Sequence, residues 1–88
     1  MNLIYLKQTI EKAILDKRWI RMDFVSAKMK ITNNRVIEPM RLKVKNGEDY
    51  VEAHCFLRDE YREFPLIGIQ KLEVISPADY NKDNDKRT

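Results

Sequence analysis

From Arg18 onward the chain alternates between apolar and polar residues, and this two-residue period restricts the fold more than any other feature of the sequence. Successive side chains of a β-strand point to opposite faces, so such alternation is typical of strands with one buried face. In the first run, Ile20, Met22 and Phe24 share one face. The same period recurs in RVIEPMRLKVK, YVEAHCFL, LRDEYREF and KLEVIS. We therefore expect about five short antiparallel strands.

Turn residues separate these runs and fix their boundaries. Asn46-Gly47 is the strongest hairpin signal, because both central residues of a type I′ turn need positive φ. Asn33-Asn34 indicates a turn within the polar segment SAKMKITNN, and a further turn is expected at residues 58–60. Gly68 interrupts the chain before the last strand. Pro39 lacks a backbone donor, so its strand is predicted to lie at a sheet edge or to be bent there.

The N-terminal segment has helical rather than strand periodicity. Its apolar residues recur at intervals of three and four: Leu3, Leu6, Ile10, Ala13 and Ile14. This predicts one amphipathic helix at about 3–16 that covers one side or end of the core. A helix and five short strands in a chain of 88 residues favour one mostly β (α+β) domain, a small barrel rather than a sandwich. The domain is expected at 1–76, with the barrel at about 18–76 and a flexible polar tail at 77–88.

The composition argues against several classes of protein. The 17 Lys and Arg residues against 14 Asp and Glu residues give a formal net charge of only +3, mild for a nucleic-acid protein. Cys55 is the single cysteine, so no internal disulfide and no zinc site are expected, and a reducing cytoplasm is favoured. No apolar run is long enough for a membrane span. We see no catalytic set or phosphate loop, and we expect no enzyme activity, cofactor, metal or membrane partner.

Beyond periodicity, an ordered set of residues resembles the WYL-domain family over about residues 8–76. The set comprises Arg35, Val36, Pro39, Leu42, Gly47, Tyr50, Val51, Ala53, Cys55, Arg58, Arg62, Phe64, Leu66 and Ile69. The resemblance implies an Sm-like small β-barrel of the kind found in bacterial and phage regulators. It further implies a sensor domain for a negatively charged ligand, with a nucleotide or single-stranded nucleic acid as leading candidates.

Carried over by position, the resemblance implies a ligand face made of five residues. They are Arg35, Tyr50, His54, Arg58 and Arg62. Alternation independently directs Tyr50 and His54 away from the core. Arginine suits an anion site because its planar fork donates paired hydrogen bonds to phosphate or carboxylate.

Each of these five residues also has a structural alternative. Arg58 and Arg62 could pair with Asp59, Glu60 or Glu63 in the turn. His54 could bond to Glu52, and Tyr50 could pack on the helix. Trp19 and Phe56 are interpreted as core or rim aromatics, and Cys55 as a small buried hydrophobe.

Four positions depart from the family pattern and predict weaker or differently selective binding. Asp49 replaces the name-giving Trp, and Val51 replaces the Leu. Phe24 stands where a Tyr is often found. Gly68 stands where a second Arg is common, which removes one cation.

The sequence therefore predicts a stand-alone, non-enzymatic module that senses an anionic ligand in transcriptional or defence regulation. A regulator protein as partner and a homodimer are both left open. The alternative is an Sm-like oligomer that binds RNA along a basic stripe of Arg41, Lys43 and Lys45. The same stripe has a simpler interpretation as the charged outer face of an edge strand, which discourages aggregation.

Overall fold

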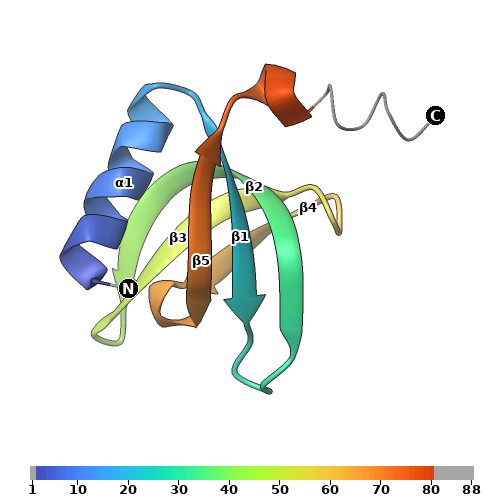
Figure 1. Ribbon diagram of the computed structural model, residues 1–88. Helices are drawn as coiled ribbons and strands as arrows, with labels where there is room; N and C mark the ends of the chain where they lie inside the picture. The colour runs from blue at the N-terminus through green and yellow to red at the C-terminus, as the bar shows by residue number, and fades with distance from the viewer. Residues whose placement is uncertain (1, 81–88) are drawn as a thin grey trace.

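The computed structural model describes residues 2–80 and consists of one helix followed by five antiparallel strands (Figure 1). The elements in chain order are α1 (Leu3–Leu15), β1 (Trp19–Val25), β2 (Ile31–Lys45), β3 (Glu48–Cys55), β4 (Glu60–Pro65), the 3₁₀ turn η1 (Leu66–Gly68) and β5 (Ile69–Ile75). They form one sheet in the order β4-β3-β2-β1-β5. The expected fold class, mostly β with an N-terminal helix, is confirmed.

The sheet is strongly curved but not closed, so the predicted barrel fits only loosely. In the described part of the chain, β4 and β5 each pair with a single neighbour, β3 and β1 respectively. The three residues of η1 carry the chain from one edge strand to the other without a ladder between them. We call the side that bears Ile20, Ile37 and Val51 the concave side and the opposite one the convex side.

Helix α1 begins at a well-formed cap and lies against the curved sheet (Figure 1). The Asn2 side-chain oxygen accepts hydrogen bonds from the backbone N–H groups of Ile4 and Tyr5, at 2.8 and 3.2 Å. The helix buries its apolar stripe of Leu6, Ile10 and Ala13. These side chains meet the concave side of the sheet in a single core, as the helical spacing predicted.

Alternation along the strands matches the prediction where one face is buried. Residues of β1 alternate strictly between half-buried and buried, and β3 buries Val51, Ala53 and Cys55 completely. The Asn46-Gly47 hairpin is also confirmed, with φ of 52° and 77° at its two central residues. Burial of Cys55 confirms its interpretation as a small core residue.

Of two predictions on β2, the turn at Asn33-Asn34 is wrong and the edge or bend at Pro39 is confirmed. Asn33-Asn34 lies inside the strand, and the turn falls earlier, where the Ser26 N–H donates to the Lys30 carbonyl at 2.9 Å. The ladder with β1 ends at Ile37, so at Pro39 the strand pairs with β3 alone, and it is also bent there by a register shift between Pro39 and Arg41. A side without a paired strand, or a bulge, accommodates a residue that lacks a ladder donor.

After β5 the chain turns back onto the sheet. Residues 77–80, assigned to the polar tail by sequence, form one helical turn in which the Ser76 hydroxyl accepts from the Asp79 N–H at 3.1 Å. The Tyr80 ring lies 5.3 Å from Trp19 and 5.2 Å from Phe56 between centroids. The rest of the predicted tail, 81–88, lies outside the described residues. Within residues 2–80, no helix is long and apolar enough to cross a membrane.

Candidate functional site

Arg35 lies on the concave side of the sheet and is nearly enclosed by the core. It stands opposite Met22 in the β1–β2 register and is only 6% exposed. Its Nε donates to the Cys55 sulfur and its Nη1 to the Thr32 hydroxyl, both at 3.3 Å. The guanidinium carbon lies 4.9 Å from the Phe64 ring centroid and 5.9 Å from that of Phe24. Two aromatic rings and two weakly polar groups therefore surround a full positive charge.

One nitrogen of this guanidinium, Nη2, has no hydrogen-bond partner. It is the only buried side-chain nitrogen or oxygen without one among residues 2–80, and no carboxylate in that range pairs with Arg35. A buried ion without a counter-ion costs several kcal/mol. Contact with the aromatic rings offsets part of this cost, about 2 kcal/mol for a desolvated cation. The remaining imbalance would be relieved by an anion.

Cys55 is linked to the same site. Burial raises the pKa of the Cys55 thiol, but the hydrogen bond from Arg35 and the backbone N–H groups of Arg58 and Leu57 outweigh it, so the pKa lies below its usual value. Backbone of the β3–β4 turn therefore points at this sulfur. The interior around Arg35 favours negative charge.

Arg62 leaves β4 on the concave side as well. It stands opposite Ala53 in the β3–β4 register, and paired residues share a face. Its Nε lies 2.9 Å from a Glu60 carboxylate oxygen, and the side chain is about half exposed. Arg58 is exposed in the β3–β4 turn, and no ion pair of its side chain occurs in the described range. The turn alternative predicted from sequence thus holds for Arg62.

Tyr50 and His54 lie on the convex side, away from Arg35. The His54 Nε2 is 3.1 Å from the Asp59 carboxylate, rather than bonded to Glu52. The Tyr50 hydroxyl is 3.5 Å from Glu48, and its ring centroid lies 5.6 Å from the Lys45 ammonium. The structure therefore divides the five residues: Arg35 and Arg62 on the concave side, Tyr50 and His54 on the convex side, and Arg58 at the turn between them.

A row of aromatic rings also runs along the convex side, and only parts of it were singled out from sequence. Trp19 and Phe56 lie 4.4 Å apart between ring centroids, His54 lies 4.7 Å from Phe56, and Tyr61 lies 5.3 Å from His54. The alternation of β1 and β3 signals Trp19 and His54. Tyr61 can be assigned to this row only from the register between β3 and β4, in which it stands opposite His54.

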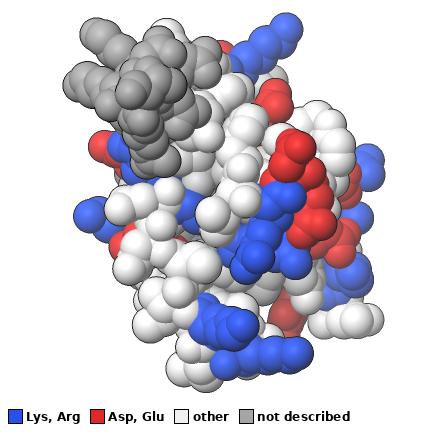
Figure 2. Space-filling model, turned by 90° about the vertical axis from the view of Figure 1, so that its right-hand side faces the viewer, with Lys and Arg blue, Asp and Glu red and all other residues white. Residues whose placement is uncertain are grey.

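The basic stripe of β2 is neutralised by two carboxylates. Lys43 lies 2.6 Å from Glu63 and 3.2 Å from Glu52, while Lys45 contacts Glu63 and Arg41 contacts Glu52. Hydrogen bonds from the two lysines lower the pKa of Glu63 to about 2. On a different face, the right-hand side of Figure 1, basic and acidic side chains also lie side by side, with further basic ones at the lower end (Figure 2). At the stripe β2 pairs with β3 alone, because its ladder with β1 ends at Ile37, so the edge-strand interpretation agrees with the pairing.

Two of the departures from the family pattern have a structural explanation. Asp49 forms an ion pair with Lys7 of α1 at 3.3 Å, so it joins helix and sheet. Gly68 is packed so closely that an added Cβ would lie 2.5 Å from the Val25 carbonyl oxygen. No larger side chain fits at Gly68 without movement of β1.

A helix-covered, curved five-stranded sheet with a buried arginine inside it defines a small β domain with a candidate anion site. The WYL domain model matches residues 6–74, and the chain belongs to the WYL-domain family. The fold is similar to part of proteasome accessory factor B/C (PafBC) of Arthrobacter aurescens, with a TM-score of 0.72 and 23% identity. That match covers 92% of this chain and 14% of PafBC. A search of curated proteins finds no match.

Proposed function

We propose that this chain is a non-enzymatic regulatory module of the cytoplasm that senses an anionic ligand, a nucleotide or single-stranded nucleic acid. The observation that carries the proposal is the Arg35 guanidinium, which is buried, lacks a carboxylate partner among residues 2–80 and keeps Nη2 without an acceptor. A phosphate oxygen supplies both the missing acceptor and the missing charge. Membership of the WYL-domain family supports a regulatory role.

Arg62 and Arg58 would extend the site outward from Arg35. Arg62 must exchange Glu60 for the ligand, which costs little because an exposed ion pair contributes about 0–1 kcal/mol. Arg58 lies at the turn without such a competitor in the described range. The three arginines would thus contact a ligand that enters from the side of the β3–β4 hairpin.

Tyr50 and His54 would serve only a ligand that continues around this hairpin to the convex side. A mononucleotide that binds at Arg35 does not extend to both sides of the sheet, whereas a single strand several nucleotides long does. The convex aromatic row that includes His54 could stack bases, and such stacking contributes about 1–3 kcal/mol per base. Ligand length therefore separates the two candidate ligands.

Isothermal titration of nucleotides and short oligonucleotides tests the proposal with wild type, Arg62→Ala and Arg58→Ala. We expect each substitution to weaken binding about tenfold, the loss of one charge-assisted bond of about 1.4 kcal/mol. Arg41→Ala is the matched control, because Arg41 is an exposed arginine of the convex side that pairs with Glu52. Absence of binding by wild type, or equal weakening by all three variants, would contradict the proposal. Turnover of the ligand would refute the non-enzymatic part.

The module would pass its signal to a partner protein. The match covers only 14% of PafBC, so the other functions of a regulator of that kind would belong to other protein segments. The regulation served would be transcriptional or defence control. A partner regulator or a second copy of the chain would receive the ligand-dependent change. Crosslinking with and without ligand would detect either arrangement.

An Sm-like RNA-binding oligomer remains the second candidate, because β4 and β5 both present unpaired edges in the described structure. Ion pairing of the basic stripe with Glu52 and Glu63 weighs against RNA binding there. Light scattering decides between the two: a monomer at micromolar concentration excludes a ring. A steep decline of RNA affinity with rising salt concentration would support the RNA-binding oligomer.

A further inference from the structure

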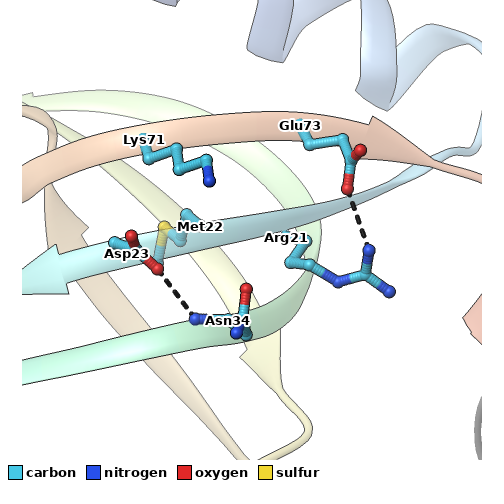
Figure 3. A pocket seen from close by; sticks show the side chains of 6 residues that line it. All are labelled: Arg21, Met22, Asp23, Asn34, Lys71 and Glu73. Carbon is cyan, nitrogen blue, oxygen red and sulfur yellow. Dashed lines mark hydrogen bonds and ion pairs between the residues drawn. The ribbon is translucent and has the colours of Figure 1, made fainter.

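A small hollow on the convex side, across the sheet from the concave side that bears Arg35, spans three strands (Figure 3). Its volume is about 140 Å³, and its lining consists of Arg21, Met22, Asp23, Asn34, Lys71 and Glu73. Ligand pockets for drug-sized molecules occupy about 300–1,000 Å³. The hollow therefore fits a molecule much smaller than a nucleotide.

The backbone around the hollow is irregular on both sides of Asp23. Against β2 the register shifts between Met22 and Phe24, and against β5 it shifts between Asp23 and Phe24. Asn34 adopts φ of 55°, and its N–H donates to the Asp23 carboxylate at 2.9 Å. Bulges re-aim side chains and are frequent beside binding sites. Here the two register shifts, one against β2 and one against β5, both lie beside the Asp23 carboxylate.

The charges around the hollow form two cross-strand pairs that differ in one respect. Arg21 and Glu73 stand opposite each other and are joined by an ion pair of 2.9 Å. Asp23 and Lys71 also stand directly opposite, but no ion pair joins them, and Lys71 has no other ion pair within residues 2–80. Both side chains border the hollow in Figure 3. An ammonium and a carboxylate thus face the same space without neutralising each other.

We propose that the hollow binds a small zwitterion of the α-amino-acid class. The ligand carboxylate would accept hydrogen bonds from the Lys71 ammonium, and the ligand ammonium would donate to the Asp23 carboxylate, whose Oδ1 is already held by the Asn34 N–H. Because Arg21 and Glu73 already form an ion pair with each other, Asp23 and Lys71 are the two charges that would bind the ligand. The site is distinct from the arginine site, and either can exist without the other.

Two-dimensional ¹H–¹⁵N NMR of the full chain tests the proposal with L-alanine as probe. We expect saturable shifts of the backbone amides of Asp23, Asn34 and Lys71, and binding about tenfold weaker in Lys71→Gln and in Asp23→Asn, which correspond to about 1.4 kcal/mol each. The amide of Asp23→Asn retains an oxygen for the Asn34 N–H, so the bulge is preserved. Lys28→Gln, in the exposed β1–β2 turn, is the matched control and should bind as wild type does.

Acetate and methylammonium at the same ionic strength separate recognition of a zwitterion from recognition of one charge. We expect each to bind at least about tenfold more weakly than L-alanine, because each satisfies only one of the two groups. Equal affinity for acetate and L-alanine would overturn the proposal. So would the absence of saturable shifts up to about 10 mM L-alanine, or unchanged affinity in Lys71→Gln, given spectra that show both variants folded.

Discussion

Replacing Arg35 with methionine should stabilise the fold and strongly weaken anion binding. The methionine side chain keeps an unbranched apolar stem in the space between Phe24 and Phe64, but it removes the charge. A purely structural arginine would show the opposite behaviour, because its loss would leave Thr32 and Cys55 without their partner. Stability and binding are therefore expected to change in opposite directions.

The contacts of Arg35 set the size of the effect. Desolvation of the charge costs several kcal/mol, and the unpaired Nη2 is part of that cost. In return the guanidinium gains about 2 kcal/mol from the rings and about 1 kcal/mol from each hydrogen bond, both of which are long at 3.3 Å. We expect Arg35→Met to gain about 1 kcal/mol, which raises Tm by roughly 4–8 °C in a domain of this size.

Thermal and urea unfolding measure the stability, and titration with the tightest-binding nucleotide or oligonucleotide measures the function. Loss of a buried anchor should weaken binding about 30-fold or more, as expected for a contact of at least 2 kcal/mol. Arg41→Met, on the convex side, controls for the removal of a positive charge. If Arg35→Met lowers stability by more than about 1 kcal/mol and leaves binding intact, the argument from the unpaired guanidinium is refuted.

Three further predictions concern other parts of the structure. Glu63→Gln should flatten the acid limb of the pH–stability curve: the folded-state pKa of Glu63, about 2, lies below its ordinary 4.5, so its contribution is complete above pH 4.5 and is lost as the pH falls towards 2. Gly68→Ala should destabilise the fold by about 2 kcal/mol in urea unfolding, because its Cβ would lie 2.5 Å from the Val25 carbonyl oxygen. Tyr80→Ala should shift the fluorescence of Trp19 to longer wavelength, since the Tyr80 ring shields it at 5.3 Å.

Each of these predictions has a control and a contrary result. Glu11→Gln, on the exposed face of α1, should leave the acid limb unchanged, and equal effects of the two glutamine variants would contradict the assignment to Glu63. Gly47→Ala meets no atom within 4 Å and should cost only the positive-φ penalty of about 1 kcal/mol. An unshifted emission maximum in Tyr80→Ala would show that residues 77–80 do not rest on Trp19 in solution.

Most of the fold follows from local sequence patterns. The helix at Leu3–Leu15, the alternation of β1 and β3 and the Asn46-Gly47 turn are each encoded within a few residues. The Asn33-Asn34 pair was misplaced, because Asn tolerates positive φ equally in a turn and in a bulge, and only the pairing with β1 distinguishes them. Pro39 predicted an edge or a bend, and the strand pairing shows both, because the ladder with β1 ends at Ile37 and the register with β3 shifts after Pro39.

The candidate site was predictable as a set of residues but not as a surface. Family resemblance supplied Arg35, Arg58 and Arg62, and alternation directed Tyr50 and His54 outward. Arg62 lies on the same side of the sheet as Arg35 because it pairs with Ala53. The length and geometry of the β3–β4 turn set that register. The resulting separation of the arginines from Tyr50 and His54 is not visible in any single strand.

The sequence by itself determined the helix, the strands, the family and the absence of an internal disulfide, because these depend on near neighbours or on counts. Only the tertiary structure decided that the sheet stays open, that Arg35 lies between Phe24 and Phe64 without a carboxylate in the described chain, and that Asp23 and Lys71 face each other unpaired. These features depend on distances between residues far apart in the chain. Burial turns such a distance into an energy, since a charge removed from water costs free energy that no local pattern records.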